Sequence, residues 1–311
     1  MGRTTAKLVS LLTPRRTWLQ FRLRMLFVLV VVVAVPCGWL KWKLDRKARE
    51  RSAVTEIATT GRVHYDWQQA GKKKPPGAAW LRKLLGDDFF SSVVVVELRG
   101  TLGCDAGLSR IIGMDRLKWL MVQGTNVTDT GLVQLRGLDR LEWLSLGDTS
   151  ITDAGLVHLS GLAQLNMLDL SRTHVTDAGL VHLESLSNLR GLSLSGTSVT
   201  DAGLVHLKTL TELEVLTLDK TDVINDAPVL RVKQITDSGL VHLQRLNRLT
   251  RLLLDGTSVK NAGLSHLKGL TRLKQLSLKN TAVTDAGVAR FQEALPQCEI
   301  VRSPPPSLFP F

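Results

Sequence analysis

The side chains in this sequence that could do chemistry are five histidines at equivalent positions of a repeated phrase. A row of imidazoles could bind zinc, which needs several ligand nitrogens about 2 Å from one ion. Neighbouring helices pack about 8–10 Å apart, so adjacent rings would have to lean toward each other. Copying of the phrase with each repeat explains the pattern without a ligand. We therefore expect no metal and no cofactor at these residues, which are His158, His182, His206, His242 and His266.

Catalytic motifs are absent from the sequence. It has no phosphate-binding glycine loop with a lysine, no nucleophile elbow and no H-E-x-x-H phrase. The aspartate of the T-D-A-G-L phrase, Asp153 for example, is interpreted as part of a helix start together with Thr152. We therefore expect a protein that is not an enzyme and has no small-molecule substrate.

The elements that carry these residues follow a repeat of 24 residues, which occupies two thirds of the chain. A fixed period of this length is typical of a solenoid, whose extended surface favours binding over catalysis. Threonines mark the period at Thr101, Thr125, Thr149, Thr173, Thr197, Thr221, Thr257 and Thr281.

One unit shows how the repeat folds. Residues 154–159 form one or two helical turns, with Leu156, Leu159 and Leu162 in one apolar stripe. The alternation of Leu168 and Leu170 has the period of a strand. Stacked units bury these leucines in a continuous spine, with parallel strands on the concave face and helices on the convex face. We expect eight strands, near Val94–Leu98, Trp119–Val122, Trp143–Leu146, Met167–Leu170, Gly191–Leu194, Val215–Leu218, Arg251–Leu254 and Gln275–Leu278.

The phrase L-x-x-L-x-L-x-x-T resembles the leucine-rich repeat, with threonine where many such proteins carry asparagine. The resemblance covers residues 92–302 and implies an α/β solenoid that recognises proteins. The T-D-A-G-L phrase resembles that of bacterial membrane-anchored repeat proteins. It resembles F-box substrate receptors less, since the repeats lack interior cysteines and nothing upstream looks like an F-box.

The 24-residue period is interrupted once, at residues 222–234, where half a repeat is inserted. Insertions in repeat arrays form loops, often beside the binding face. Two interpretations stay open, a decayed repeat and a protruding functional loop.

The outward residues of the strands are the candidate site. Trp119 and Trp143 occupy neighbouring strands and, with two methionines, form an apolar patch that suggests a protein contact. Alternatively, the N-terminal cap folds over the tryptophans. The acidic residues of the candidate set would form ion pairs with a basic ligand. The full candidate set is Trp119, Met121, Trp143, Met167, Asp169, Asp219, Arg251 and Asp255.

The N-terminal part contains an uncharged run, Met25–Leu40. Its sixteen residues span about 24 Å as a helix, short of a hydrocarbon core of roughly 30 Å. Flanking basic residues and the interfacial Trp39 and Trp42 can close the gap. We interpret residues 25–42 as a single-pass transmembrane helix that follows a basic segment, 1–24.

The positive charge of the chain lies beside this run. Residues 1–52 carry twelve Lys and Arg and two acidic residues, whereas residues 91–311 carry 22 of each. This distribution indicates a membrane flank and argues against a nucleic-acid partner. The basic residues next to the span slightly favour repeats in the cytoplasm, but large domains translocate largely regardless of charge. The resemblance to anchored bacterial proteins favours an extracytoplasmic position.

Residues 43–91 join the span to the repeats. We expect a polar helix over 45–58, a short strand over 62–67 and an amphipathic helix over 79–90. That last helix could lie on the membrane surface or cap the first coil, and its direct attachment to the first strand favours the cap. Residues 303–311 are proline-rich and predicted to be disordered.

Three cysteines cannot form a disulfide framework. Cys37 lies in the span, and Cys104 and Cys298 lie in the first and last coils, too far apart to bridge.

Three functions fit these features. The first is a membrane-tethered module that binds a protein partner on the concave face. The alternatives are a self-associating structural protein and an adaptor for ubiquitin-type degradation.

Overall fold

The computed structural model describes residues 25–72, 74–98, 104–219 and 235–302. The inserted segment 222–234, the basic segment 1–24 and the tail 303–311 therefore lie outside the described residues. The chain divides into two units, Met1–Ser52 and Ala53–Phe311, which are treated separately below.

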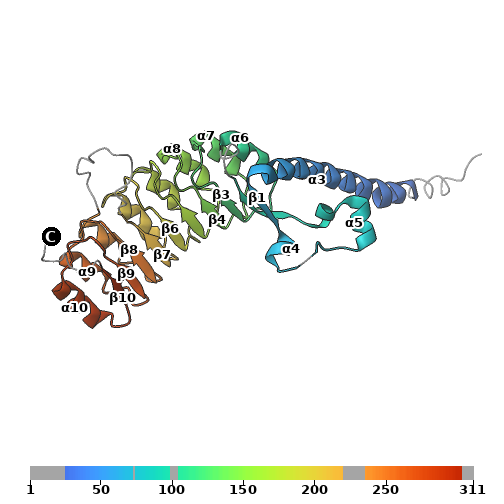
Figure 1. Ribbon diagram of the computed structural model, residues 1–311. Coiled ribbons are helices and arrows are strands. Elements are labelled where there is room, and N and C mark those ends of the chain that lie inside the picture. The colour runs from blue at the N-terminus through green and yellow to red at the C-terminus, as the bar shows by residue number, and fades with distance from the viewer. Residues whose placement is uncertain (1–24, 73, 99–103, 220–234, 303–311) are drawn as a thin grey trace, which may run out of the picture. The chain divides into compact units, whose positions relative to one another are not determined.

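The second unit is built on a single sheet whose strands follow one another in chain order (Figure 1). All neighbouring strands are parallel except the first pair. The eight strands expected from the repeat are present, each ending one residue earlier than predicted. The strands are β1 Arg62–Tyr65, β2 Val93–Glu97, β3 Trp119–Met121, β4 Trp143–Ser145, β5 Met167–Asp169, β6 Gly191–Ser193, β7 Val215–Thr217, β8 Arg251–Leu253, β9 Gln275–Ser277 and β10 Glu299–Val301.

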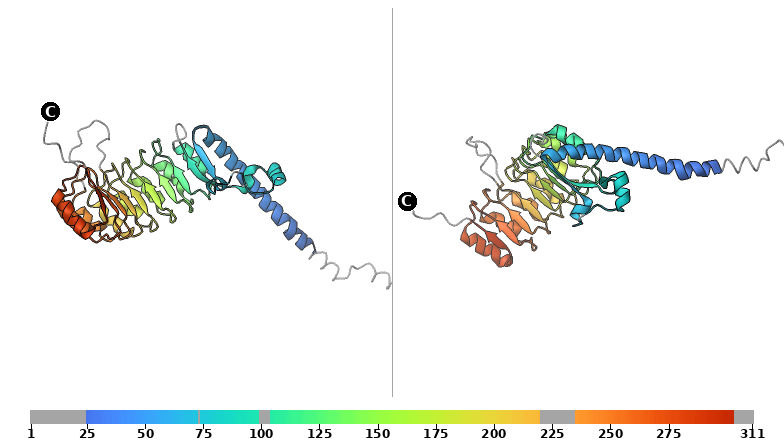
Figure 2. Two further views of the ribbon diagram at one scale, coloured as in Figure 1. Left: turned by 60° about the horizontal axis from the view of Figure 1, so that its bottom comes forward. Right: turned by 45° about the vertical axis from the view of Figure 1, so that its right-hand side comes forward.

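Short helices, one or two per coil, cover one face of the parallel sheet (Figure 2). The α-helices are α3 Val35–Thr60, α4 Asp66–Gln69, α5 Ala79–Leu85, α6 Asp105–Leu108, α7 Asp129–Leu132, α8 Asp153–Leu156, α9 Asn261–Leu267 and α10 Asp285–Ala294. The 3-10 helices are η2 Asp87–Phe90, η4 Ser109–Ile111, η5 Val133–Leu135, η6 Val157–Leu159, η7 Gly179–Leu183, η8 Gly203–Thr209 and η9 Gly239–Leu243, and a π-helical turn, η1, spans Val30–Ala34.

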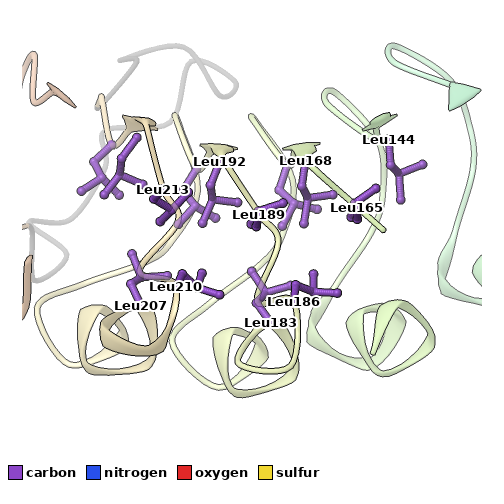
Figure 3. Packing of buried hydrophobic residues seen from close by; sticks show 14 of the residues in the cluster. Leu144, Leu165, Leu168, Leu183, Leu186, Leu189, Leu192, Leu207, Leu210 and Leu213 are labelled. Atoms are coloured by element: carbon purple, nitrogen blue, oxygen red, sulfur yellow. The ribbon is translucent and has the colours of Figure 1, made fainter. Parts of the chain in front are cut away.

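Leucines from the strands and helices meet between these two layers (Figure 3). Leu168 and Leu192 face inward from adjacent strands, and each is 2% exposed. Leu183 and Leu186 reach the same core from the helical side and are 0% and 1% exposed. One coil cannot bury these side chains alone, so the stacking of coils creates the core.

The repeated threonines close the turn after each strand. Thr149 Oγ1 donates to the carbonyl oxygen of Leu146 at 2.5 Å, and Thr173 Oγ1 donates to Leu170 at 2.7 Å. Both threonines are buried, so an unpaired carbonyl there would be costly. The same bond recurs at Thr125, Thr197, Thr257 and Thr281.

Asp153 and Asp285 begin helices α8 and α10, as predicted, and the aspartates of T-D-A-G-L also link one coil to the next. Asp153 Oδ1 accepts the backbone N–H of Thr176 at 2.8 Å, and its Oδ2 accepts the Thr176 hydroxyl at 2.6 Å. Thr152 does accept from the amide of Ala154, as expected for a cap. Equivalent links join Asp105, Asp129, Asp177 and Asp201 to the following coil.

Asp105 shows the electrostatic effect of such a link. Burial alone would raise the pKa of its carboxyl group, but hydrogen bonds from Thr128, Thr130 and the Gly131 amide outweigh burial and lower the pKa. A depressed pKa means that the folded state favours the charged carboxylate. This contribution to stability is present above the unfolded pKa and is lost as the pH falls through the folded pKa.

The glycine of the same phrase leaves room for the aspartate. A Cβ atom on Gly179 would lie 2.3 Å from Asp153 Oδ1. Gly179→Ala should therefore displace the carboxylate and lower the free energy of unfolding by about 2 kcal/mol or more, measured by denaturant melts.

Gly161 is the matched control, because a Cβ atom there meets nothing within 4 Å. Gly161→Ala should change stability by no more than about 0.5 kcal/mol. In a double-mutant cycle, Asp153→Ala should absorb most of the cost of Gly179→Ala, since the clashing atom is gone. Additive costs would contradict the proposed clash.

The stack continues across the insertion. Asp201 accepts the Thr236 amide at 2.7 Å and its hydroxyl at 2.6 Å, as in the other coils. Strands β7 and β8 pair in the usual register, with Leu216 opposite Leu252. Residues 219 and 235 therefore belong to adjacent regular coils.

The N-terminal end of the sheet differs from the expectation for residues 79–90. Helix α5 ends at Leu85 because Gly86 adopts φ 95°, and residues 87–90 form η2. No residue of α5 is buried, and Trp80 and Leu84 are 69% and 73% exposed, so α5 does not cap the core with its apolar side. The predicted strand in 62–67 is present as β1, which pairs antiparallel with β2, and Ile57 of α3 is fully buried in the core.

The last coil adds a strand that the sequence analysis did not predict. Strand β10 pairs with β9, with Ile300 opposite Leu276. Phe291 of α10 is fully buried where other coils place leucine. All three cysteines lie in the described part of the chain and are free thiols, and burial raises the pKa of Cys298 to about 11.

The first unit contains the apolar run. Met25–Thr59 forms a 35-residue helix that begins in this unit and is long and apolar enough to cross a membrane, with none of its apolar window buried. The polar helix expected over 45–58 is the continuation of the same helix within α3.

Candidate functional site

Two rows of side chains point away from the core on the parallel sheet, a surface called here the strand face. The strand register sets both rows, because directly paired residues share a face. The first row is Val95, Trp119, Trp143, Met167, Gly191, Val215, Arg251 and Gln275. The second row is Glu97, Met121, Ser145, Asp169, Ser193, Thr217, Leu253 and Ser277.

The first row contains an open apolar cluster. The rings of Trp119 and Trp143 lie 5.4 Å apart, centroid to centroid, and are tilted by 60°. Trp143 is 36% exposed, Met167 is 39% exposed and Trp119 is half-buried. The structure thus leaves Trp143 and Met167 accessible from the strand face.

Gly191 leaves room for the side chain of Met167. A Cβ atom on Gly191 would lie 2.4 Å from Met167 Sδ, so the thioether lies over the glycine. Gly191 is not among the site residues predicted from the sequence, although a glycine in a strand often marks a close approach by another group. Methionine is flexible and polarizable, which lets it adapt to different partners.

These side chains border a hollow of about 610 Å³ on the strand face. Its polar lining comes from the second row and from loops that follow the strands. The lining includes Glu97, Met121, Gln123, Trp143, Ser145, Met167, Asp169, Gly191, Ser193, Val215 and Thr217. The hollow brings together four of the candidate residues, Met121, Trp143, Met167 and Asp169, and Trp119 borders it through Trp143.

Asp169 is held in place by neighbouring groups. Its Oδ2 accepts the hydroxyl of the buried Ser145 at 3.2 Å, and its Oδ1 accepts the Ser171 amide at 2.9 Å. A carboxylate fixed in this way is a preorganised acceptor at the edge of the hollow.

The remaining candidates lie outside the lining of the hollow. Asp219 Oδ1 accepts the Asp255 amide at 2.9 Å, and Asp255 Oδ1 accepts the Lys279 amide and the Ser277 hydroxyl, at 2.7 and 2.6 Å. Burial raises the pKa of Asp219 and outweighs the hydrogen bond from the Asp255 amide, which lowers it. Both carboxylates therefore stabilise adjacent coils. Arg251 is exposed in the first row, beyond Val215.

The alternative in which the N-terminal cap covers the outward row agrees with the structure only at strand β2. Val95 is on the outward row but is 4% exposed, and His64 of β1 lies opposite it in the sheet. The outward position predicted for Val95 is correct in register, but the residue is buried. Trp143, two strands further on, is open.

Three of the histidines, His158, His206 and His266, contact side chains of the preceding coil. Arg136 Nη2 donates to His158 Nδ1 at 3.0 Å, and His206 Nδ1 pairs with Glu184 at 2.7 Å. Burial lowers the pKa of His158, and the charge of Arg136 lowers it further. Within the described residues no group of three His, Cys, Asp or Glu side chains is arranged to hold a metal ion.

The helical face carries a separate apolar column. Each valine that precedes the repeated His or Gln position is a candidate for this column, since it points away from the leucine core. Four of these are between 40% and 45% exposed: Val133, Val157, Val181 and Val241.

Comparison with known proteins agrees with this architecture. The leucine rich repeat family model matches residues 115–175. No curated protein sequence matches the chain. An internalin (inlF) of Listeria monocytogenes shares 22% identity, with 66% of this chain and 51% of that chain covered and a TM-score of 0.50.

Internalin C2 of the same organism also shares 22% identity, with 70% of this chain and 82% of that chain covered and a TM-score of 0.51. The chain thus spans about half the length of the first internalin. At this identity the likeness concerns the fold. Residues 115–175 match the leucine rich repeat family, and the coils, the threonine bonds and the buried leucine rows agree with the fold of the two internalins.

Proposed function

We propose that the chain is a membrane-tethered recognition module that binds a protein partner on the strand face. Leucine-rich repeat proteins generally mediate protein–protein recognition, and solenoids offer extended surfaces for it. The repeats carry equal numbers of basic and acidic residues, so a protein partner suits the module better than a nucleic acid.

The observation that carries this proposal is the exposed pair Trp143 and Met167 beside the hollow. Tryptophan dominates measured hot spots when it fills a pocket that excludes water. Trp119 supports Trp143 from the adjacent strand, and Asp169 and Ser193 supply a polar edge. The partner should therefore offer an apolar side chain to the tryptophans and a hydrogen-bond donor to Asp169.

Site-specific photo-cross-linking tests this assignment. A photoreactive amino acid at Met167 should capture a partner, whereas the same group at Val157 on the helical face should not. The two sites are matched, since Met167 is 39% and Val157 43% exposed. A partner captured only from Val157 would place recognition on the helical face and contradict the proposal.

Self-association is the second candidate because the valine column is an exposed apolar surface. It would appear in the same experiment as cross-links between two copies of the chain, formed from Val157. Components of a degradation pathway captured from Met167 would instead support an adaptor role.

The membrane tether rests on the helix Met25–Thr59. At the end of its apolar part, Lys43 Nζ lies 5.1 Å from the ring of Trp39, and the Arg46 guanidinium lies 5.5 Å from Trp42. Paired tryptophan and basic side chains suit the interface of a bilayer. A transmembrane helix fits these observations. The resemblance to anchored bacterial repeat proteins favours repeats on the extracytoplasmic side.

The full chain should remain with membranes after alkaline carbonate extraction, because a transmembrane helix inserts almost irreversibly. A chain that begins at Ala53 should be released in the soluble fraction, since it lacks the apolar run. Fractions from both are compared by immunoblotting. Release of the full chain by carbonate would rule out the transmembrane anchor.

A further inference from the structure

Helix α5 has an outward side made of residues that suit a membrane surface. Trp80 and Leu84 stand four positions apart, on the same side of the helix, and are 69% and 73% exposed. Lys83 lies beside them and is also exposed, whereas Leu81 and Leu85 are partly buried. Trp80 and Leu84 therefore face solvent.

This orientation is fixed by contacts at the base of the helix. Arg82 Nη1 donates to the Pro75 carbonyl at 2.9 Å, which ties the helix to the preceding loop. Gly77 packs against the Phe90 ring, and the rings of Phe89 and Phe90 meet edge to face at 5.0 Å. Phe89 is buried, so this base is part of the folded unit. The exposure of Trp80 and Leu84 is thus a property of the fold.

Exposed lysines stand in α5 and in the loop that precedes it. Lys72 and Lys74 of the preceding loop are exposed, as is Lys83. The exposed acid Asp87 lies 3.8 Å from Arg82. Tryptophan, leucine and lysine on one side of a short helix match the chemistry of the bilayer interface, where the indole sits at the headgroups and lysines attract anionic lipids.

We propose that α5 is a second membrane contact, which inserts Trp80 and Leu84 into the headgroup region of an anionic bilayer. Charge complementarity selects lipid as the occupant, because Lys83 lies between Trp80 and Leu84 in the chain and exposed lysines precede the helix. The membrane tether adds to this choice, since a helix in the same chain would hold α5 close to the bilayer and raise its effective concentration there. The inference therefore rests on the tether proposed above.

Hydrogen–deuterium exchange of the full chain in lipid nanodiscs tests the proposal. The backbone amides of residues 78–86 should exchange at least about threefold more slowly in nanodiscs that contain phosphatidylglycerol than in phosphatidylcholine alone. Trp80→Ser with Leu84→Ser should abolish the difference. The matched control, Val157→Ser with Val181→Ser on the helical face, should leave it unchanged.

Reversing the charge of the lysines is an independent test of the same proposal. Lys72→Glu, Lys74→Glu and Lys83→Glu together should also remove the dependence on anionic lipid, and exposed positions make unfolding of this variant unexpected. Equal exchange in both lipids, with the chain still resistant to carbonate, would overturn the α5 contact and leave the tether standing. Release by carbonate would overturn the tether itself. Protection that persists in the lysine variant would mean that anionic headgroups do not recognise α5, and it would overturn the assignment to anionic lipid.

Discussion

Replacing Leu192 by alanine should lower the free energy of unfolding by about 2–5 kcal/mol, the usual range for a buried leucine. Leu192 is 2% exposed and pairs with Leu168 on one side and Leu216 on the other. The cavity would open in the middle of the spine, where two neighbouring coils share it. Denaturant melts measure the loss.

Ser193→Ala is the matched control, because Ser193 is the next residue of the same strand and faces outward. Its replacement should change the free energy of unfolding by no more than about 0.5 kcal/mol. Equal costs at the two positions would mean that the inward and outward sides of the strand are exchanged. A broadened transition for Leu192→Ala would be informative too, since stability in a solenoid is a sum over neighbouring coils and a weak coil can uncouple its two sides.

The sequence predicted the strands well because eight copies of one phrase locate the same element. A strand of three residues, such as Met167–Asp169, has too little pattern to be recognised alone. Repetition every 24 residues places Leu144, Leu168 and Leu192 in one row, and the pairing of the strands follows. Strand β10 lacks this support, since the last coil departs from the phrase, and the sequence analysis missed it.

The hydrogen bonds from each aspartate to the next coil could not be predicted from the sequence of one coil. In the sequence, Thr152 and Asp153 are neighbours and read as a helix cap. In the fold, Asp153 turns to Thr176, which lies in the next coil. The stacking of the coils brings Thr176 within reach of Asp153. The glycine that permits this approach, Gly179, has no local reason to be a glycine.

The ends of the solenoid were harder still, because a cap is not a repeated element. The amphipathic pattern of residues 79–90 favoured a helix that covers the core, but β1 and Ile57 already fill that place. The apolar residues of α5 then face outward. An apolar stripe in a sequence predicts burial against something, and it does not say whether that partner is the protein itself.

On the strand face, the sequence identified the side chains but not their environment. The register alone placed Trp119, Trp143 and Met167 in one row. It could not show that Met167 leans over Gly191, or that Asp219 and Asp255 are engaged with the next coil. These contacts concentrate the candidate site at β3 to β6 and set it apart from Arg251.

Trp143→Ala should weaken binding of the partner at least about tenfold while leaving the thermal midpoint nearly unchanged. Trp143 is 36% exposed, so truncation removes contact area without opening a cavity in the leucine core. The loss arises because the indole would fill an apolar site on the partner, and alanine cannot exclude water from that site. Isothermal titration of the cross-linked partner, purified and unmodified, measures the affinity.

Trp80→Ala is the matched control, since it removes an exposed indole from α5 and not from the strand face. Measured in detergent, where no bilayer is present, Trp80→Ala should leave the affinity for the protein partner unchanged. Trp119→Ala should lie between the two variants, because Trp119 is half-buried and acts partly by supporting Trp143 at 5.4 Å. If Trp143→Ala instead unfolds the repeats with no separable binding defect, the two tryptophans are packing residues. The valine column on the helical face would then be the exposed surface on which recognition has to be sought.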